Sequence, residues 1–265
     1  MRDYSINPIL NTVRQRLWRL NKNWIAAFIG DPGSGKSFAS LEVADYIEKG
    51  KFSIDRVFFK VRDLLKAVDD GEIKKGMAVI LDEAGIAWKA RAFMRQENQD
   101  MSDLFQVMRF MNFALIMTVP SLAFIDKHGR GLCKMVFRTK TINHEKRIST
   151  CEVFYITSNP LTGKVYPKWP RIMINGVRHK AAMMNIAHPR DELADEYEIR
   201  KKAYGREVVH EQRMKAEARD AKEAEQAEQE PKKPYSCKKC GYEGKTTRPK
   251  PRCGRCNSSI VVVDG

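Results

Sequence analysis

The chain has 265 residues, a formal net charge of +15 and 43% hydrophobic residues. This composition is typical of a globular protein and excludes a disordered or fibrous chain. No apolar run approaches the roughly 20 residues that a membrane-spanning helix needs, and residues 1–20 carry arginines where a signal peptide is apolar. We therefore expect a folded cytoplasmic protein without a transmembrane segment, whose positive charge favours DNA or another anionic partner, such as an acidic membrane.

Residues 1–23 carry apolar side chains at helical spacing, with arginines on the other faces. The apolar positions are Ile6, Ile9, Leu10, Val13, Leu17 and Leu20. This period predicts a helix that packs against the core. A solvated amphipathic helix and an arm that contacts DNA are the alternatives.

Residues 30–37 read Gly-Asp-Pro-Gly-Ser-Gly-Lys-Ser and fit the phosphate-loop pattern G-x-x-x-x-G-K-[ST] at every fixed position. Residues 24–29 before the loop are apolar and predict a strand buried on both faces. Residues 37–48 after it have apolar positions at helical spacing. Strand, loop and helix are the context that the motif requires, because the helix N-terminus then points at the phosphates. A chance glycine turn is the alternative.

The loop predicts the contacts that hold ATP. Its glycines let the chain curl tightly enough for several backbone N–H groups to converge on phosphate oxygens. Lys36 is expected to contact the β- and γ-phosphates, and the Ser37 hydroxyl to ligate Mg²⁺. The predicted nucleotide-binding residues of the loop are Gly30, Asp31, Pro32, Gly33, Ser34, Gly35, Lys36 and Ser37.

A second acidic element follows within the same series of strands and helices. Residues 56–61 predict a strand and residues 62–70 a helix, and the apolar residues 77–81 then run directly into Asp82 and Glu83. Ligands of parallel sheets lie at the carboxyl ends of the strands, so both carboxylates should meet the phosphate loop. Asp82 is expected to hold Mg²⁺ and Glu83 to polarise the attacking water. A helix N-cap is the alternative for this acidic pair.

The remainder of the first domain is predicted to end in antiparallel strands. Residues 87–111 predict a loop and then a helix, and residues 114–119 predict a buried strand that ends at Pro120. Residues 135–168 alternate as expected for hairpin strands at a sheet edge. Residues 167–179 are basic and contain Trp169, so they predict either a nucleic-acid contact or a solvated strand.

The C-terminal part divides into a charged segment and a cysteine-rich module. Residues 190–230 contain thirteen acids and nine bases and predict an exposed linker helix. Four cysteines follow as two C-x-x-C pairs, Cys237 with Cys240 and Cys253 with Cys256. This spacing is typical of a zinc ribbon, in which four thiolates leave no open position for catalysis. Disulfides are the alternative. Cys133 and Cys151 are expected to be buried apolar residues.

Three features of the sequence belong together: the phosphate loop, the Leu-Asp-Glu-Ala strand end at residues 81–84, and a helix carrying Arg109 before a strand with a polar end. In these features the chain resembles the FtsK-HerA superfamily of DNA-pumping P-loop ATPases. The small phage, viral and conjugation members, including Zot-like proteins, look closest. This resemblance implies a RecA-like α/β fold and a ring, commonly hexameric, with ATP between neighbouring subunits and DNA in the middle. Where that superfamily often has a glutamine sensor, this chain has Thr118 or Ser121.

These features predict three parts: a P-loop ATPase domain over residues 1–189, a linker over 190–230 and a zinc ribbon over 231–265. The predicted function is a ring motor that hydrolyses ATP to move DNA, with Lys36, Glu83 and the arginine finger Arg109 as catalytic residues and Asp82 and Thr118 in the nucleotide site. Arg91 and Arg95 are the other candidates for the finger, and a surface ion pair is the alternative role for Arg109. The alternative is an ATP-dependent switch or loader, targeted by a ribbon that binds DNA or a protein partner. A metabolic phosphotransferase is a third possibility, but no acceptor signature is present.

Overall fold

The structure is a computed structural model that describes residues 7–83, 105, 111–125, 127–159, 161–162, 164–229, 233–246 and 252–259. Contacts divide the chain into two compact units, residues 1–201 and residues 202–265. Across the described ranges, no helix combines the length and apolarity needed to cross a bilayer.

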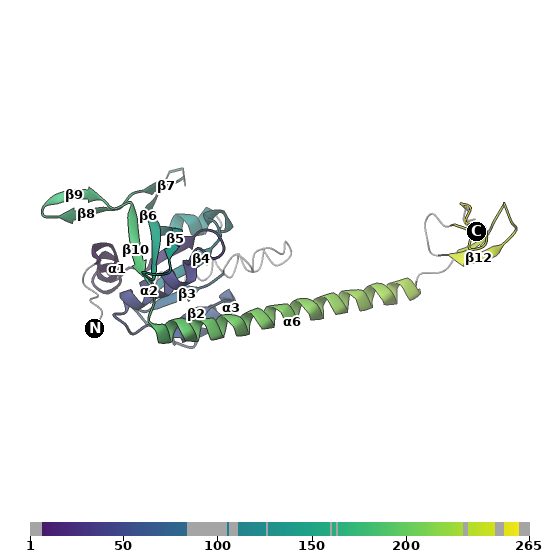
Figure 1. Ribbon diagram of the computed structural model, residues 1–265, viewed down its shortest axis with the longest axis horizontal. Coiled ribbons are helices and arrows are strands. Elements are labelled where there is room, and N and C mark those ends of the chain that lie inside the picture. Colours follow the sequence, from purple (N-terminus) through teal and green to yellow (C-terminus); the bar gives the residue numbers. More distant parts are fainter. Residues whose placement is uncertain are drawn as a thin grey trace. The chain divides into compact units, whose positions relative to one another are not determined.

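The first unit is built on an eight-stranded sheet in the order β10-β6-β5-β1-β4-β3-β2, with β7 added to β6 (Figure 1). Its parallel part contains β1 (Trp24–Ile29), β2 (Val57–Phe58), β3 (Ala78–Leu81), β4 (Ala114–Val119) and β5 (Met135–Asn143). Every residue of β3 and β4 is buried. Continuous burial explains why these two strands are apolar at every position except Thr118. The sheet confirms the predicted α/β fold with a mostly parallel central sheet.

Helices cover the parallel strands. They are α1 (Pro8–Trp18), α2 (Lys36–Ile47) and α3 (Val61–Asp69), with α5 (Lys127–Leu132) preceding β5. The apolar stripe of α1 is buried, as the helical spacing predicts. Leu64 of α3 packs in one cluster with Ile25 and Ala27 of β1, whereas α2 contacts β1, β3 and β4. Only two residues of the predicted strand over 56–61 form β2, because α3 begins at Val61.

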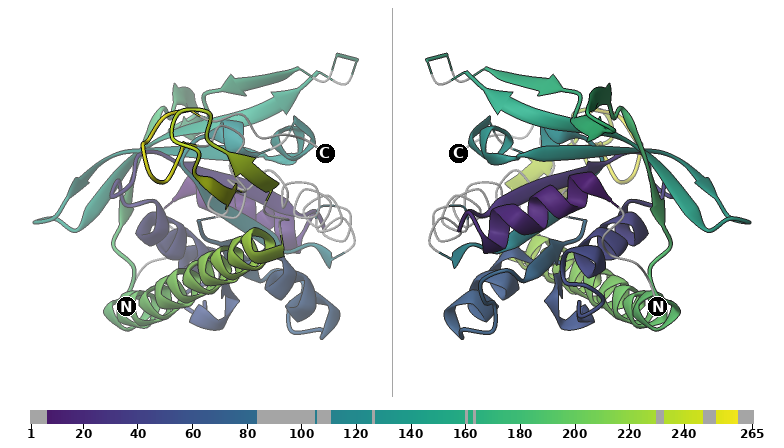
Figure 2. Two further views of the ribbon diagram at one scale, coloured as in Figure 1. Left: turned by 90° about the vertical axis from the view of Figure 1, so that its right-hand side faces the viewer. Right: turned by 90° about the vertical axis from the view of Figure 1, so that its left-hand side faces the viewer.

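The antiparallel part confirms the predicted edge hairpin. β5 pairs with β6 (Ile148–Ser158), which also pairs with β7 (Val165–Lys168) and β10 (Met183–Ala187). The sequence patterns did not predict β10. Between β7 and β10, β8 (Arg171–Ile174) and β9 (Val177–Lys180) pair with each other and form a two-stranded hairpin that extends from the sheet (Figures 1 and 2).

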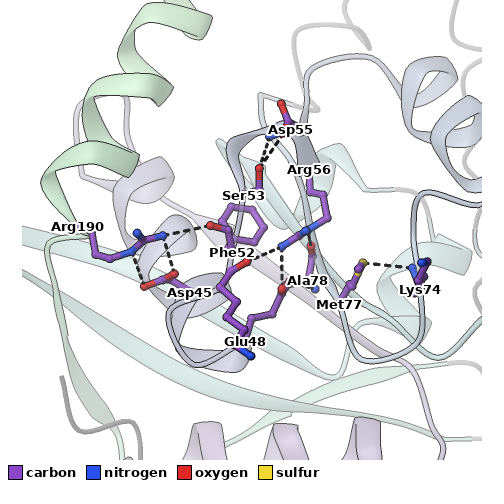
Figure 3. Close-up of polar contacts among 11 residues, drawn as sticks. Asp45, Glu48, Phe52, Ser53, Asp55, Arg56, Lys74, Met77, Ala78 and Arg190 are labelled. Carbon is purple, nitrogen blue, oxygen red and sulfur yellow. Dashed lines mark hydrogen bonds and ion pairs between the residues drawn. The ribbon is translucent and has the colours of Figure 1, made fainter. Parts of the chain in front are cut away.

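Polar contacts join α2 to its surroundings at the side shown in Figure 3. Arg190 donates to the fully buried carboxylate of Asp45 over 3.2 Å. Glu48 accepts a hydrogen bond from the Ala78 backbone N–H over 2.6 Å and one from Arg56 over 2.7 Å. Burial raises the pKa of Glu48, and these two donors oppose that shift. The end of α2 is thereby tied both to β3 and to the residue preceding α6 (Asp191–Gln229).

The charged helix α6 begins in the first unit and continues into the second. Its first turns are not a solvated linker, because Leu193, Ala194 and Tyr197 are buried. The rest of the second unit contains the two-stranded sheet of β11 (Lys233–Ser236) and β12 (Glu243–Thr246). The four cysteines of the predicted ribbon lie beside this small sheet and gather in one cluster.

Candidate nucleotide-binding site

The phosphate loop joins β1 to α2 with backbone conformations that favour glycine. Gly30 has φ +146° and Gly35 has φ +85°. A side chain at Gly30 would also collide with Thr139 of β5, whose Oγ1 would lie 2.4 Å from an added Cβ. Gly35 is the N-cap of α2 and provides no side-chain hydrogen bond to the helix. The first N–H groups of α2 are thus available to an anion at the loop.

The Lys36 amine lies across the loop. It donates hydrogen bonds to the carbonyl oxygens of Gly30 over 2.9 Å and Asp31 over 2.7 Å. Burial lowers the pKa of Lys36, and the negative charge of Asp82 opposes that shift. A compact positive charge held over a curl of N–H groups suits the phosphates of a nucleotide. The other loop side chains lie outside this contact: Asp31 and Pro32 are exposed, and Ser34 bonds Thr139 over 2.6 Å.

Asp82 connects the second element to the loop. Its carboxylate is fully buried at the carboxyl end of β3. Oδ1 accepts hydrogen bonds from the Ser37 hydroxyl over 3.0 Å and the Thr118 hydroxyl over 2.5 Å, and Oδ2 accepts one from the Tyr197 hydroxyl over 2.5 Å. A hydroxyl and a carboxylate side by side form an oxygen-only donor set, which fits Mg²⁺. The residues that would hold the ion are Ser37 and Asp82.

Glu83 has an unusual backbone for a residue with a side chain. Its φ is +51°, in the left-handed region, and its N–H donates to the Thr118 hydroxyl over 2.8 Å. Strained backbone of this kind is concentrated at functional sites, where surrounding contacts hold it in place. Thr118 therefore contacts both acids, whereas the Ser121 hydroxyl accepts from the Ala123 N–H in a neighbouring turn. Of the two polar candidates, Thr118 near the end of β4 and Ser121 just after it, only Thr118 reaches the acidic pair.

Two residues of the site were missed by sequence reasoning, and both lie in α6. Tyr197 donates to Asp82, and Lys201 pairs with Glu83 over 2.9 Å and lies 3.9 Å from Asp82. Burial raises the pKa of Tyr197, and Asp82 adds to that shift. Burial opposes the charge on Lys201, but Asp82 and Glu83 more than offset this effect and raise its pKa. The sequence feature that could have pointed to Tyr197 is its aromatic side chain within the highly charged segment 190–230.

Arg109, the predicted arginine finger, lies outside the described residues. The remaining predicted residues of the nucleotide site fall into one neighbourhood. The loop, Asp82, Glu83 and Thr118 all lie at the carboxyl ends of β1, β3 and β4, which are hydrogen-bonded neighbours in the sheet. This is the edge where parallel α/β sheets bind ligands.

The cysteine cluster of the second unit fits a tetrahedral zinc ion. Its four sulfur atoms all lie within 4.8 Å of one another, and the Cys237–Cys256 and Cys240–Cys253 sulfur pairs are 3.6 Å apart. Zinc–sulfur bonds of about 2.3 Å require tetrahedral sulfur pairs to be about 3.8 Å apart. The four thiolates would hold the ion in a closed structural site.

The two halves of the cysteine cluster have matching turns. The N–H of Gly241 donates to the Cys237 carbonyl over 2.8 Å, and the N–H of Asn257 donates to the Cys253 carbonyl over 2.9 Å. Gly241 and Asn257 both have positive φ, at +67° and +55°. Each C-x-x-C pair therefore presents its sulfur atoms from the same kind of turn.

Comparison with known proteins gives partial matches. Residues 62–166 match the family model described as "Zonular occludens toxin (Zot)". That segment is less than half of the chain and includes Asp82, Glu83 and Thr118 but not the phosphate loop. No curated protein sequence matches the chain.

Three solved structures are similar at low identity. The N-terminal domain of zonular occludens toxin from Neisseria meningitidis is 18% identical, with 56% of this chain and 94% of that chain covered and a TM-score of 0.34. The DnaC helicase loader is 19% identical, with 46% and 73% covered and a TM-score of 0.27. The KaiC-like protein PH0186 from Pyrococcus horikoshii OT3 is 12% identical, with 65% and 80% covered and a TM-score of 0.28.

Such TM-scores do not establish a shared fold by themselves. The chain's own geometry is more specific: a glycine loop between a buried strand and a helix, a buried aspartate that bonds the loop serine, and a mostly parallel sheet. The chain therefore carries the phosphate-binding site of a P-loop NTPase and resembles the Zot family over residues 62–166.

Proposed function

We propose that the protein is a DNA-translocating ATPase. The observation that carries this proposal is the contact of Asp82 with Ser37 over 3.0 Å, which brings the acidic strand end to the phosphate loop with Glu83 beside it. P-loop ATPases use such a pair to bind the metal and to activate water. The net charge of +15 supports an anionic polymer as the partner on which the ATPase acts.

Each residue has a separate task in the proposed reaction. The loop N–H groups and Lys36 bind and orient the β- and γ-phosphates and stabilise charge on the transferring group. Ser37 and Asp82 hold Mg²⁺, which when bound neutralises phosphate charge. Glu83 accepts a proton from the water that attacks the γ-phosphate. Thr118 holds both acids through the hydrogen bonds described above.

The assembly is proposed from the resemblance to ring ATPases. A cytoplasmic ring, with six subunits as the commonest number, would bring a second chain's Arg109 to the ATP of its neighbour. An arginine supplied in this way stabilises the transition state and is worth roughly 10³- to 10⁵-fold in rate. The zinc ribbon would bind DNA or a protein partner, since lysines and arginines surround its cysteines in the sequence.

An ATP-dependent switch or loader is the second candidate, and one observation favours it. The Glu83 carboxylate is engaged by Lys201 over 2.9 Å, and Asp82 is engaged by Tyr197. A base that is held by an ammonium is less able to take a proton from water. Hydrolysis would then be slow until α6 moves, which is how a switch retains its ATP state.

The deciding experiment measures ATP turnover by the full chain with and without DNA, together with displacement of streptavidin from biotinylated DNA ends. A motor predicts DNA-stimulated turnover and ATP-dependent displacement, whereas a switch predicts slow turnover and no displacement. Glu83→Gln should retain ATP binding and lose turnover by at least about a hundredfold, because an amide cannot accept the proton. Lys36→Ala should lose nucleotide binding or turnover.

Glu72→Gln is the matched control, since Glu72 is an exposed glutamate outside the site. It should turn over ATP as the parent protein does. Normal turnover by both Lys36→Ala and Glu83→Gln would reject the ATPase proposal.

A further inference from the structure

A cavity lies at the edge of the sheet opposite the phosphate loop. Its volume is about 1100 Å³, and it lies between α1, the first residues of β1 and β5, and the last residues of β6 and β7. β1 starts at this cavity with Trp24 and ends at the loop with Ile29, so one six-residue strand separates the two sites. The cavity is thus distinct from the nucleotide site.

The charged residues that line this cavity are all basic. They are Arg16, Lys134, Lys168, Arg171 and Lys180, and we call them the basic groove. Among the described residues, no carboxylate lies within ion-pair distance of any of the five. This contrasts with Arg56 and Arg190 at the α2 side, each of which pairs with a carboxylate.

Two cations of the basic groove, Arg16 and Lys134, are partly buried, which disfavours their charged forms. Burial lowers the pKa of Arg16 and that of Lys134, and the charge of Arg16 lowers the pKa of Lys134 further. Arg16 lies in α1 and Lys134 directly precedes β5, so the fold itself brings them together. Cations that repel one another inside a cavity are relieved by an anion that binds among them.

Aromatic side chains stand beside these cations. Tyr155 and Trp169 line the cavity, and the Trp169 ring packs against Phe154 with 4.5 Å between ring centroids. The Lys180 ammonium lies 4.4 Å from the Trp169 centroid. Lys180 is exposed, so it can turn toward a phosphate and leave the indole to a base. Cations interspersed with aromatic rings are typical of surfaces that bind single-stranded nucleic acid.

We propose that the basic groove binds single-stranded nucleic acid, with phosphates at the cations and a base against Trp169. This inference rests on the proposed function, in that it names the surface where an ATPase acting on DNA contacts its substrate. The recessed shape favours a single strand, because the bases of a duplex are stacked inside it and cannot reach an aromatic ring in a cavity. A strand bound here lies at the other end of β1 from the nucleotide.

The first test is the affinity of the full chain for a fluorescent single-stranded oligonucleotide, measured by anisotropy over a range of salt. The double variant Lys168→Gln with Arg171→Gln removes two exposed cations of the groove. Its affinity should fall at least about tenfold, and the slope of log K against log salt should fall by about 1.4, since each single-strand phosphate contact contributes about 0.7. The matched control is Arg62→Gln with Lys66→Gln on exposed positions of α3.

The second test asks where the strand lies and whether its bases matter. An iodouracil-substituted oligonucleotide should photo-crosslink to Trp169 or Tyr155, as located by peptide mass spectrometry, even if the ribbon adds affinity elsewhere. Trp169→Leu should weaken binding of this strand about tenfold, because the variant lacks the aromatic face on which a base stacks. An abasic strand of equal charge should bind both proteins equally.

Three outcomes would overturn the proposal: unchanged affinity of the groove double variant, crosslinks that fall only outside the groove, or equal binding of the abasic and normal strands. Equal binding would assign the groove to polyanions in general, and preferential binding of anionic lipid vesicles would assign it to a membrane surface. Measuring ATP turnover without DNA distinguishes failure of the groove proposal from failure of the ATPase proposal. Groove variants should retain it, whereas Lys36→Ala should lose it and still bind the strand.

Discussion

At the scale of single residues, the site depends on a buried carboxylate that contacts several other groups. Asp82 accepts hydrogen bonds from Ser37, Thr118 and Tyr197, which lie in three different elements. A buried charge is tolerated only when such donors surround it. The same bonds that stabilise the fold therefore aim the carboxylate at the loop, so substitutions here should affect stability and activity together.

Substitution of Thr118 tests whether these hydrogen bonds support both stability and activity. Thr118→Val keeps the shape but removes the hydroxyl, which leaves Asp82 with one donor fewer and the part-buried N–H of Glu83 without its acceptor. We expect a loss of about 1–3 kcal/mol in the free energy of unfolding. We also expect at least about a tenfold fall in kcat, because the Glu83 backbone loses the hydrogen bond that positions it. Urea unfolding and steady-state ATP turnover measure the two effects.

Thr118→Ser is the companion variant, since it restores the hydroxyl without the methyl group. It should recover most of the turnover lost in Thr118→Val. If Thr118→Val unfolds and turns over like the parent protein, the Thr118 hydrogen bonds do not position the acidic pair.

At the scale of elements, the first turns of α6 belong to the nucleotide site. Arg190 anchors the start of the helix to Asp45, and Tyr197 and Lys201 reach the acidic pair from later turns (Figure 3 shows the Arg190 contact). Tyr197 is 2% exposed, so this contact is part of the packed core. A change in the packing of the start of α6 would therefore alter the contacts of Asp82 and Glu83.

Lys201→Gln tests the effect of that docking on hydrolysis. The ammonium holds the Glu83 carboxylate and opposes proton transfer from water, so its removal should raise ATP turnover in the absence of DNA about two- to fivefold. The expected effect is modest because both side chains are about one-third exposed, at 36% and 33%, and water screens the pair. Steady-state turnover at saturating ATP measures it.

Lys202→Gln, at the next and exposed position, should leave turnover unchanged and is the control. A fall of about tenfold in Lys201→Gln would instead make Lys201 a residue that assists the reaction, and would remove the observation that favours a switch.

At the scale of the whole molecule, the two units have different sources of stability. The first has a large apolar core around the sheet, whereas the described cluster of the second consists of the four cysteines. A module of this size cannot bury enough apolar surface to fold alone, so a bound metal would supply its stability. The two units should therefore respond independently to metal removal.

We expect one zinc per chain in protein purified under reducing conditions, as measured by elemental analysis. A chelator should raise hydrogen exchange in β11 and β12 and leave β1 and β4 protected. Cys256→Ser should lower the zinc content, because it removes one of the four thiolates that would hold the ion. Cys151→Ser, in β6 of the first unit, is the control and should keep its zinc. Protein without zinc but with ordered β11 and β12 would contradict the metal site.

The sequence alone determined the parts of this protein that local chemistry encodes. The phosphate loop, the acidic pair after an apolar run and the paired C-x-x-C motifs each depend on neighbouring residues, because backbone curl, strand direction and metal-ligand spacing are short-range properties. The mostly parallel α/β fold could be predicted because short apolar runs alternate along the chain with segments of helical periodicity.

Only the tertiary structure decided which distant residues complete the sites. Tyr197 bonds Asp82 across 115 residues of chain, and Thr118 rather than Ser121 reaches the acidic pair because β4 lies beside both β1 and β3. In the same way, Arg16 of α1 and Lys134, the residue before β5, line the same cavity. The physical reason is that such contacts follow from strand order and helix docking, which no local period or spacing expresses.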